Sequence, residues 1–586
     1  MSLQFITGNS GNGKTKYLFN RIVKEAKANP RDNYLVIVPE QFTMQTQRLL
    51  VDLSENKAIM NIDVLSFKRL AYRVFDELGI TNLTVLEETG KNLVLRKLAA
   101  QEADKLGVIG RNLNRIGYIS EVKSLLSELV QYNISPEELG RYIASGRLSD
   151  ALSDKLKDVL VLYEAFEKFM QDKYITAEEI LNVLSNVAEE SAILRNSVIA
   201  FDEFTGFTPI QNQLIKKLFV ISKKIYVTLT IDCREDIFKS RGMQELFDMP
   251  KRTVKSLTEM AAFYGIEVEE PIILDKNYRL AENEELSFME QQLFRKRRCS
   301  FEKAPKHIHI DCLRDPKQEL TKIARRINEL VRNENLRYRD IAIVTGDVNI
   351  YAGYVREIFD KYNIPYFIDA TQEILFHPFI EFIRSIPDIA AQNFSADAVF
   401  RFLRCGFSEL LDSEIDVLEN YVLACGVRGK SAWDKKWVRL PKHKAGYDLE
   451  LLNQSREYIM ELLKPVYQVF SDKKSTVKDY VLAIYKLIVL LDIPDKLAKK
   501  EQALLDAGDQ TASKEYGQIY KIVMQLFEKY VAVLGDECMD AEEFTQILDA
   551  GLDAADVAVI PPGYDTVTIG DIERTRLTNI KVMFFA

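Results

Sequence analysis

The chain has 586 residues, of which 47% are hydrophobic and 28% are charged. This composition is that of a folded globular protein, and the length favours several domains over one. Only 25 glycines and 16 prolines occur, which excludes collagen-like and low-complexity classes, and the net charge of −9 means that any binding of nucleic acid needs a local basic surface.

The sequence has no apolar run of the roughly 18 to 20 residues that span a bilayer. Its first residues, MSLQFITGNSG, lack the basic-then-apolar pattern of a secretory signal, so we expect a cytoplasmic protein with no membrane partner. The six cysteines contain no CxxC pair and the four histidines lack metal-ligand spacing, which disfavours a zinc site.

The first elements alternate strands with helices. Residues 3–7 form an apolar run that ends in a glycine-rich loop, and residues 16–28 follow with helical spacing. A β-branched run at 33–41 is typical of a buried parallel strand. A further strand is expected at 61–65, where Ser66 can cap the next helix. Such alternation predicts a parallel α/β sheet.

From about residue 85 to about residue 190, long amphipathic patterns predict a helical insertion. Strands then resume at 197–204 and 223–232. A second set of strands, in which His307 and His309 alternate, is expected at 307–313, 339–346, 364–369 and within 565–586.

The order of these patterns predicts two α/β cores, each interrupted by a helical domain. The last residues, IKVMFFA, end on an apolar strand, so we expect the second core to be truncated. The predicted parts are 1–85 with 191–270 (first core), 86–190 (first insert), 271–395 with 554–586 (second core) and 396–553 (second insert).

A phosphate-binding loop is the clearest motif. The run Gly8-Asn9-Ser10-Gly11-Asn12-Gly13-Lys14-Thr15 fits GxxxxGK[ST] at every fixed position, between a predicted strand and a predicted helix. Its glycines let the backbone wrap phosphates, while N–H groups and the helix N-terminus supply positive potential. We expect ATP and Mg²⁺ as cofactors, with Lys14 on the β- and γ-phosphates and Thr15 on the metal.

A phosphate-binding loop needs an acidic partner on a neighbouring strand. Residues 197–201 form an apolar strand that ends in Asp202 and Glu203. Asp202 is expected to hold Mg²⁺ and Glu203 to polarise the attacking water.

Two segments offer the local cations that DNA binding needs. Residues 295–298 are four consecutive cations, and 428–444 contain seven Lys or Arg against one Asp, together with Trp433 and Trp437. Cations with interleaved aromatic rings suit phosphate contact and base stacking. Equally, each segment fits a solvated loop, and the tryptophans fit one buried helical face.

The residues after Asp202 narrow the class of nucleotide-binding protein. The run from Asp202 to Gln211, DEFTGFTPIQ, resembles the second motif of UvrD/Rep-like superfamily 1 helicases, and Asn277-Tyr278-Arg279 is similar to the fourth. Residues 338–343 and 364–366 resemble the start of the second motor domain. The resemblance implies two RecA-like P-loop domains with helical insertions (1A, 1B, 2A and 2B), and a catalytic Arg279 on the γ-phosphate.

A narrower resemblance, carried by residues 1–15, 36–43 and the GDIERTR run at 570–576, is to the AddB (RexB) family. AddB is the B subunit of the bacterial AddAB helicase–nuclease, which processes DNA double-strand breaks for homologous recombination. The resemblance implies binding of ATP, single-stranded DNA and a duplex end, recognition of Chi, and a heterodimer with an AddA-type subunit. It places the nuclease domain and an iron–sulfur cluster beyond residue 586.

Two departures from the helicase pattern predict weak ATPase for this chain, and the nuclease domain that the resemblance places beyond residue 586 predicts that the chain has no nuclease activity. Residues 230–238, at the third motif, lack the Gln that senses the γ-phosphate, and Glu235 aligns there. The GDIERTR run replaces the fifth motif. Two alternatives stay open: an autonomous ATP-dependent DNA helicase, and a non-catalytic scaffold in which ATP only stabilises the fold.

Overall fold

The computed structural model describes residues 1–80, 85–110, 118–145, 148–171, 174–295, 299–369, 372–374, 376–441, 447–472, 474–553, 556–557, 565–573, 575, 577 and 580–586. Two compact units divide the chain: residues 1–87 with 124–310, and residues 88–123 with 311–586. Over the described ranges, none of the helices has the length and apolar character needed to cross a membrane.

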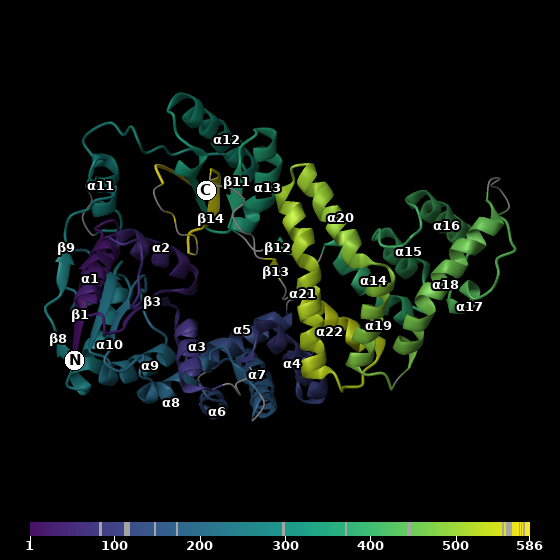
Figure 1. Ribbon diagram of the computed structural model, residues 1–586, viewed down its shortest axis with the longest axis horizontal. Helices are drawn as coiled ribbons and strands as arrows, with labels where there is room; N and C mark the ends of the chain where they lie inside the picture. Colours follow the sequence, from purple (N-terminus) through teal and green to yellow (C-terminus); the bar gives the residue numbers. More distant parts are fainter. Residues whose placement is uncertain are drawn as a thin grey trace. The chain divides into compact units, whose positions relative to one another are not determined.

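The first unit is built on a parallel sheet, of which β1, β3, β8 and β9 are labelled in Figure 1. The strand order is β3-β2-β6-β7-β1-β8, and β9 also pairs with β1. All of its pairings are parallel. The strands are β1 (Ser2–Gly8), β2 (Tyr34–Ile37), β3 (Ile62–Leu65), β6 (Val198–Phe201), β7 (Lys224–Thr230), β8 (Glu267–Val268) and β9 (Ile272–Leu274).

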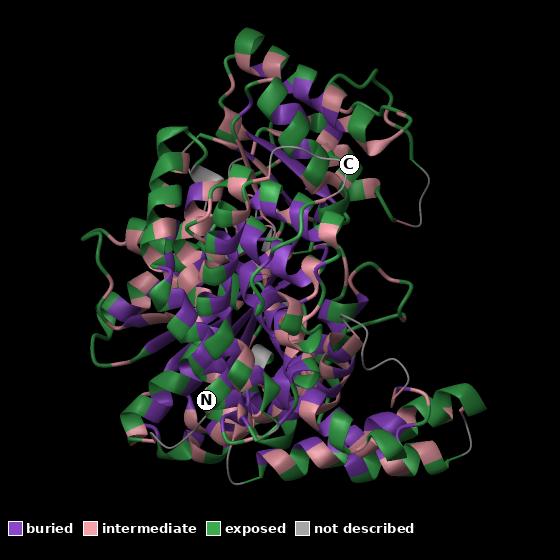
Figure 2. Ribbon diagram, turned by 90° about the vertical axis from the view of Figure 1, so that its right-hand side faces the viewer, coloured by how far each residue is buried: buried purple, intermediate pink, exposed green. Residues whose placement is uncertain are grey.

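Helices cover both faces of this sheet. The covering helices are α1 (Lys14–Ala28), α2 (Thr43–Leu53), α3 (Phe67–Leu78), α8 (Ile180–Val187), α9 (Pro209–Ile221) and α10 (Asp248–Phe263). Along β1, Leu3 and Phe5 pack into the core with α3, α8, α9 and α10, whereas Ile6 packs with α1. Burial on both faces explains why these strands read as continuous apolar runs (Figure 2). Ser66 caps α3, as predicted.

A helical region interrupts the first unit. It contains α6 (Pro136–Ala144), α7 (Asp150–Met170) and the part of α5 (Tyr118–Gln131) from residue 124 on. A small parallel pair joins β4 (Val85–Leu86) to β5 (Ile175–Thr176). The helical prediction for this region is confirmed.

The second unit contains a smaller parallel sheet with the order β11-β14-β10-β15. Its strands are β10 (Ile341–Thr345), β11 (Tyr366–Ile368), β14 (Val567–Asp571) and β15 (Val582–Phe585), and α12 (Pro316–Asn333) and α13 (Val348–Lys361) pack on it. Strands were predicted at each of these places.

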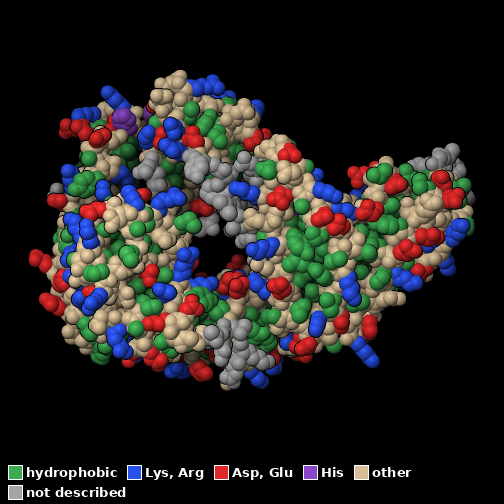
Figure 3. Space-filling model, in the orientation of Figure 1, with side chains coloured by type: hydrophobic (Ala, Val, Ile, Leu, Met, Phe, Trp, Pro, Cys, Tyr) green, Lys and Arg blue, Asp and Glu red, His purple; other side chains and the backbone are tan. Residues whose placement is uncertain are grey.

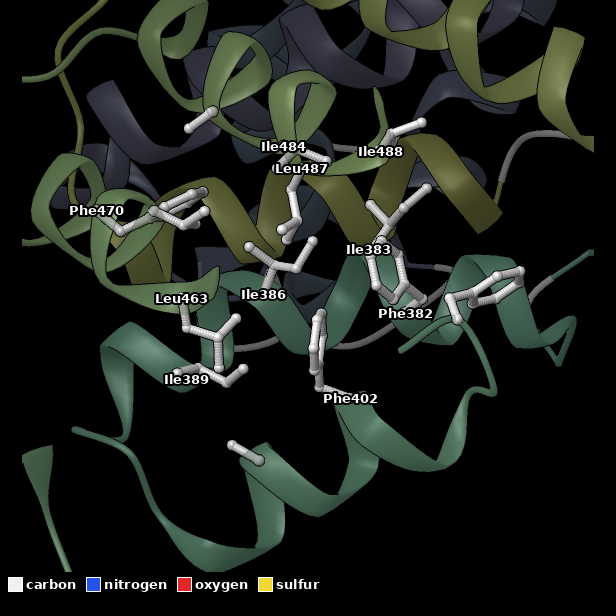
Figure 4. Close-up of a cluster of buried hydrophobic side chains, with 14 of the residues drawn as sticks. Phe382, Ile383, Ile386, Ile389, Phe402, Leu463, Phe470, Ile484, Leu487 and Ile488 are labelled. Carbon is white, nitrogen blue, oxygen red and sulfur yellow. The ribbon is translucent and has the colours of Figure 1, made fainter. Parts of the chain in front are cut away.

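Helices fill the rest of the second unit, as predicted for 396–553. They are α14 (Pro378–Ala391), α15 (Ala396–Arg404), α16 (Asp412–Cys425), α17 (Lys430–Trp433), α18 (Leu449–Ser471), α19 (Val477–Leu490), α20 (Ile493–Asp506), α21 (Gln510–Leu534) and α22 (Ala541–Asp553). They share one apolar core, in which side chains of α14, α15, α18 and α19 point toward one another (Figure 4).

Three sequence predictions need correction. The strand expected at 307–313 does not form; at its start, Glu285 of α11 (Glu284–Gln292) accepts the backbone N–H groups of Lys306 and His307 at 2.7 and 2.8 Å. Residues 271–310, assigned to the second core, belong to the first unit, since β9 pairs with β1.

The third correction concerns α4 (Glu88–Gln101), which was assigned to the first insert. It lies in the second unit, where Arg96 donates to Gln546 at 2.8 Å and Lys97 pairs with Glu537 at 2.7 Å. The remaining boundaries of the four predicted parts stay predictions.

Candidate nucleotide-binding site

The glycines of residues 8–15 shape the loop between β1 and α1. Gly11 and Gly13 have φ angles of 87° and 78°, a left-handed region that side chains disfavour. A Cβ atom on Gly11 would also lie 2.8 Å from both Arg279 Cβ and Asn277 Oδ1. Gly11 is therefore required both for the loop's conformation and for the close approach of the segment around residue 278.

Two buried asparagines anchor this loop to neighbouring segments. Asn9 Nδ2 donates to Glu290 Oε1 at 2.7 Å, and its Oδ1 accepts the backbone N–H of Cys233 at 3.1 Å. Asn12 Nδ2 donates to the carbonyl of Leu274 at 2.5 Å. Both side chains were predicted among the cofactor-binding residues, and the structure gives them an anchoring role in the loop.

Lys14 places its ammonium group inside the loop. Nζ donates to the carbonyl oxygens of Gly8 and Asn9, each at 3.0 Å. Burial lowers the pKa of Lys14 from 10.5 to about 8, against the opposing pull of Glu203 and Asp202, and Arg279 lowers it further. The group is therefore mainly charged at neutral pH, with donors that an anionic ligand can take over.

Thr15, Asp202 and Glu203 gather oxygen atoms at the ends of neighbouring strands. Thr15 Oγ1 donates to Asp202 Oδ1 at 3.3 Å and lies 3.4 Å from Glu203 Oε1. Thr228 of β7, which the sequence did not single out, donates to the same Asp202 oxygen at 2.5 Å. Hydroxyl and carboxylate oxygens are the ligands that Mg²⁺ prefers, so this donor set fits the metal expected here.

Glu203 is held in an unusual backbone conformation. Its φ angle is 67°, which is uncommon and costs free energy for a non-glycine residue other than Asn or Asp. The turn lets consecutive carboxylates, from buried Asp202 and exposed Glu203, both reach Thr15.

The segment that carries Arg279 lies along the loop. The backbone N–H of Tyr278 donates to the carbonyl of Gly11 at 3.0 Å, and Arg279 Nη1 lies 3.4 Å from Ser10 Oγ. Residues 202, 203 and 279 therefore all lie against the loop of residues 8–15 in the first unit.

The stretch after β7 differs from the expectation. Glu235, expected to face a phosphate, pairs with buried Lys251 at 2.7 Å, so its charge is compensated. Next to the loop, Ile231 N–H donates to the Gly8 carbonyl at 3.3 Å. Buried Asp232 pairs there with Arg234 at 2.6 Å and with Arg295 at 2.8 Å. Burial would raise the pKa of Asp232, but hydrogen bonds and charge from Arg234, with Arg295, hold it at about 2.

One residue of the first basic segment, residues 295–298, takes part in the ion pairs of Asp232. Arg295 is bound to Asp232 and lies over the ring of Phe247, 4.9 Å from its centroid. It is therefore not available to a DNA phosphate in this structure. Residues 296–298 lie outside the described residues.

The second basic segment corrects the prediction for its tryptophans. Trp433 and Trp437 are 0% and 6% exposed and belong to the apolar core, so they are not stacking platforms. Asn453 bonds to both the backbone N–H and the carbonyl of Trp437, at 2.8 and 2.9 Å. The alternative interpretation is correct in that both rings are buried, but they do not share one helical face, because α17 ends at Trp433.

Some cations of this segment are paired with a carboxylate and others are exposed. Lys430 pairs with Asp434 at 2.7 Å, whereas Arg428, Lys435, Lys436 and Arg439 are exposed. Lys442 and Lys444 lie outside the described residues. On the face in Figure 3, Lys and Arg side chains are interspersed with Asp and Glu over the surface.

The chain is similar in sequence to a known protein family and to several of its members. Residues 5–290 match the family model described as "ADDB, N-terminal". The B subunit of the ATP-dependent helicase/deoxyribonuclease of Lachnoclostridium phytofermentans is 39% identical over all of this chain and 52% of its own length. Proteins of the same description from Clostridium novyi and Caldanaerobacter subterraneus subsp. tengcongensis are 31% and 32% identical, each over 51% of its length. The chain thus spans about half the length of the curated relatives it matches.

Proposed function

The chain is a homologue of AddB, the B subunit of ATP-dependent helicase/deoxyribonucleases, and carries the AddB N-terminal domain; on that premise we propose that it is the helicase-like part of such a subunit. In this role it binds Mg-ATP and single-stranded DNA, contributes to Chi recognition, and works with an AddA-type subunit on duplex ends in double-strand break repair. The nuclease domain and an iron–sulfur cluster are assigned to the half of the relatives that this chain does not match.

The observation that carries the proposal is the convergence of Lys14, Thr15, Asp202, Glu203 and Arg279 on one glycine-rich loop. These residues come from three widely separated parts of the sequence, yet Thr15 lies 3.3 Å from Asp202 and Arg279 lies 3.4 Å from Ser10. A loop at a helix N-terminus with a lysine and clustered oxygens suits a nucleotide phosphate with its metal.

Each residue has a role in the proposed chemistry. Lys14 pairs with the β- and γ-phosphates, Thr15 and Asp202 hold Mg²⁺, Glu203 orients the attacking water, and Arg279 offsets charge on the γ-phosphate. Mg²⁺ supplies neutralisation of phosphate charge when it is bound.

The DNA part of the proposal rests on the relatives' description as helicase/deoxyribonuclease subunits and on the exposed cations Arg428, Lys435, Lys436 and Arg439. Phosphate contacts from such cations give affinity without sequence preference. Chi recognition and the AddA-type partner follow from homology alone.

Calorimetric titration with Mg-ATP tests the nucleotide site. Lys14→Ala removes the phosphate's charge partner, and we expect nucleotide binding to be lost. Lys16→Ala, a change at an exposed lysine two residues on, is the matched control and should bind like the wild type. Unchanged affinity in Lys14→Ala would show that the site assignment is wrong.

Turnover separates the proposal from its two alternatives. Strong DNA-stimulated ATP hydrolysis by this chain alone would favour an autonomous helicase. Nucleotide binding that raises the melting temperature, without turnover in the complete heterodimer, would favour a scaffold in which ATP acts by mass action.

A further inference from the structure

Asn277 lies between the glycine-rich loop and Arg279, and its side-chain amide bonds to both. Nδ2 donates to the carbonyl oxygen of Ser10 at 3.1 Å. Oδ1 accepts the backbone N–H of Arg279 at 3.1 Å and that of Leu280 at 3.0 Å. One amide therefore joins the loop to the turn from which Arg279 projects.

The start of this turn is held by bonds that do not involve Asn277. Gly8 of β1 pairs with Leu274 of β9 in the sheet, and Asn12 donates to the Leu274 carbonyl. Beyond β9, the Asn277 amide and the backbone bond from Tyr278 to Gly11 hold the turn against the loop. Contact is close, because a Cβ atom on Gly11 would lie 2.8 Å from Asn277 Oδ1.

Arg279 needs such support because its side chain is long and exposed. An exposed arginine loses rotamer freedom when it binds, which opposes binding. A fixed backbone at Arg279 limits the volume that the guanidinium group samples. Its Nη1 atom lies 3.4 Å from Ser10 Oγ, so the side chain is already directed to the loop.

We propose that Asn277 is a positioning residue that sets Arg279 against the terminal phosphate of a bound nucleoside triphosphate, so that the site distinguishes triphosphate from diphosphate. The inference rests on the proposed nucleotide site. A diphosphate lacks the third phosphate, and the bond that Arg279 makes to it exists only in the triphosphate complex. Asn277 acts through Arg279 and is not itself assigned a contact with the ligand.

Asn283 is a control for a purely structural role of Asn277. Asn283 also accepts a backbone N–H, that of Leu286 at 3.1 Å, and caps α11. Among the described residues its amide makes no bond to the loop. Asn283→Ala therefore removes a comparable bond from a side-chain amide to a backbone N–H, without the connection to Arg279.

The test measures dissociation constants of the 586-residue chain for Mg-ADP and for the non-hydrolysable triphosphate AMP-PNP. Arg279→Ala should lower triphosphate affinity about tenfold or more, the range for hydrogen bonds to charged groups. Asn277→Ala should lower the ratio of triphosphate to diphosphate affinity about tenfold. In the Arg279→Ala background, Asn277→Ala should change that ratio no further, because coupled residues are not additive. Asn283→Ala should leave the ratio at its wild-type value.

Two results would overturn the inference while leaving the nucleotide site in place. One is a wild-type ratio in Asn277→Ala, whether both affinities are unchanged or both fall equally, and the other is an additive loss in the double variant. Equal losses would mean that Asn277 acts on the loop alone. A wild-type chain that binds neither nucleotide would overturn the proposed function, and this inference with it.

Discussion

The lowered pKa of Lys14 predicts how nucleotide affinity changes with pH. The ammonium group is charged below its pKa of about 8, and phosphates bind the charged form. Affinity should therefore fall as pH rises through 8. With this pKa, ~91% of the group is charged at pH 7 and ~9% at pH 9, a ratio of about ten, or about 1.4 kcal/mol in binding free energy.

Calorimetry with Mg-ADP from pH 7 to pH 9 measures this effect. A terminal phosphate titrates near pH 6, below the range used, so the ligand's own charge stays constant. Phosphates should restore the proton on Lys14, so at pH 9 about 0.9 proton should be taken up for each nucleotide bound. Titrations in buffers with different ionisation enthalpies report that uptake.

Lys14→Arg is the control, because a guanidinium group keeps its charge throughout this range. The other groups that set the pKa of Lys14, namely Asp202, Glu203 and Arg279, remain in the variant. Its affinity should be independent of pH even if it is weaker overall. Constant wild-type affinity from pH 7 to pH 9, or the same decline in Lys14→Arg, would refute the reasoning.

Three further predictions concern the core, the DNA contact and turnover. Trp437→Ala should cost ~3 to 5 kcal/mol of folding free energy and lower the melting temperature, while DNA affinity of the folded fraction stays the same; a selective loss of DNA affinity would contradict the buried position. Reversing Lys435, Lys436 and Arg439 to Glu should flatten the log–log salt dependence of DNA binding by about 2 to 3 units, whereas Lys430→Ala, which removes a cation paired with Asp434, should change it little; an unchanged slope in the triple variant would move the DNA path elsewhere. Steady-state ATP hydrolysis by this chain should stay below about 10 s⁻¹, the median for enzymes. Faster turnover would contradict the inference that the missing sensor Gln slows hydrolysis.

The inner part of the candidate site could be predicted because its determinants are local. The pattern from Gly8 to Thr15 fixes a strand, a turn and a helix N-terminus within a few residues. The acidic pair at 202 and 203 ends an apolar strand, and parallel strands bring their carboxyl ends to one edge of the sheet. Both features follow from short-range patterns and a general rule of sheet topology.

The outer part of the site could not be predicted in this way. β9 was assigned to the second core, yet Leu274 pairs with Gly8 of β1. Nothing in the run IIL specifies which strand it joins, since pairing depends on contacts far apart in sequence. The bond from Asn277 to Ser10 follows from that pairing, so it too was beyond the sequence pattern.

The tryptophans show a different limit. In a helix, a spacing of four residues would place Trp433 and Trp437 on one side, whether that side faces a core or a ligand, but α17 ends at Trp433. Burial decides between the two, and it depends on α16 and α18, which pack around them. Asn453 and Arg456 of α18 satisfy backbone carbonyls of Trp437 and Trp433, respectively, a pairing that no local pattern indicates.

In the proposed function, the third-motif region leaves nucleotide binding unopposed but slows nucleotide hydrolysis. A sensor Gln can donate a hydrogen bond to a phosphate, whereas an ionised carboxylate can only accept one. Glu235 is held by Lys251 at 2.7 Å and Asp232 by Arg234 and Arg295, so neither carboxylate is left as an uncompensated charge beside the loop. Binding through Lys14 and Thr15 is therefore not opposed by these residues. The site loses a donor for the transition state, and in the proposed function that loss slows hydrolysis while affinity is retained.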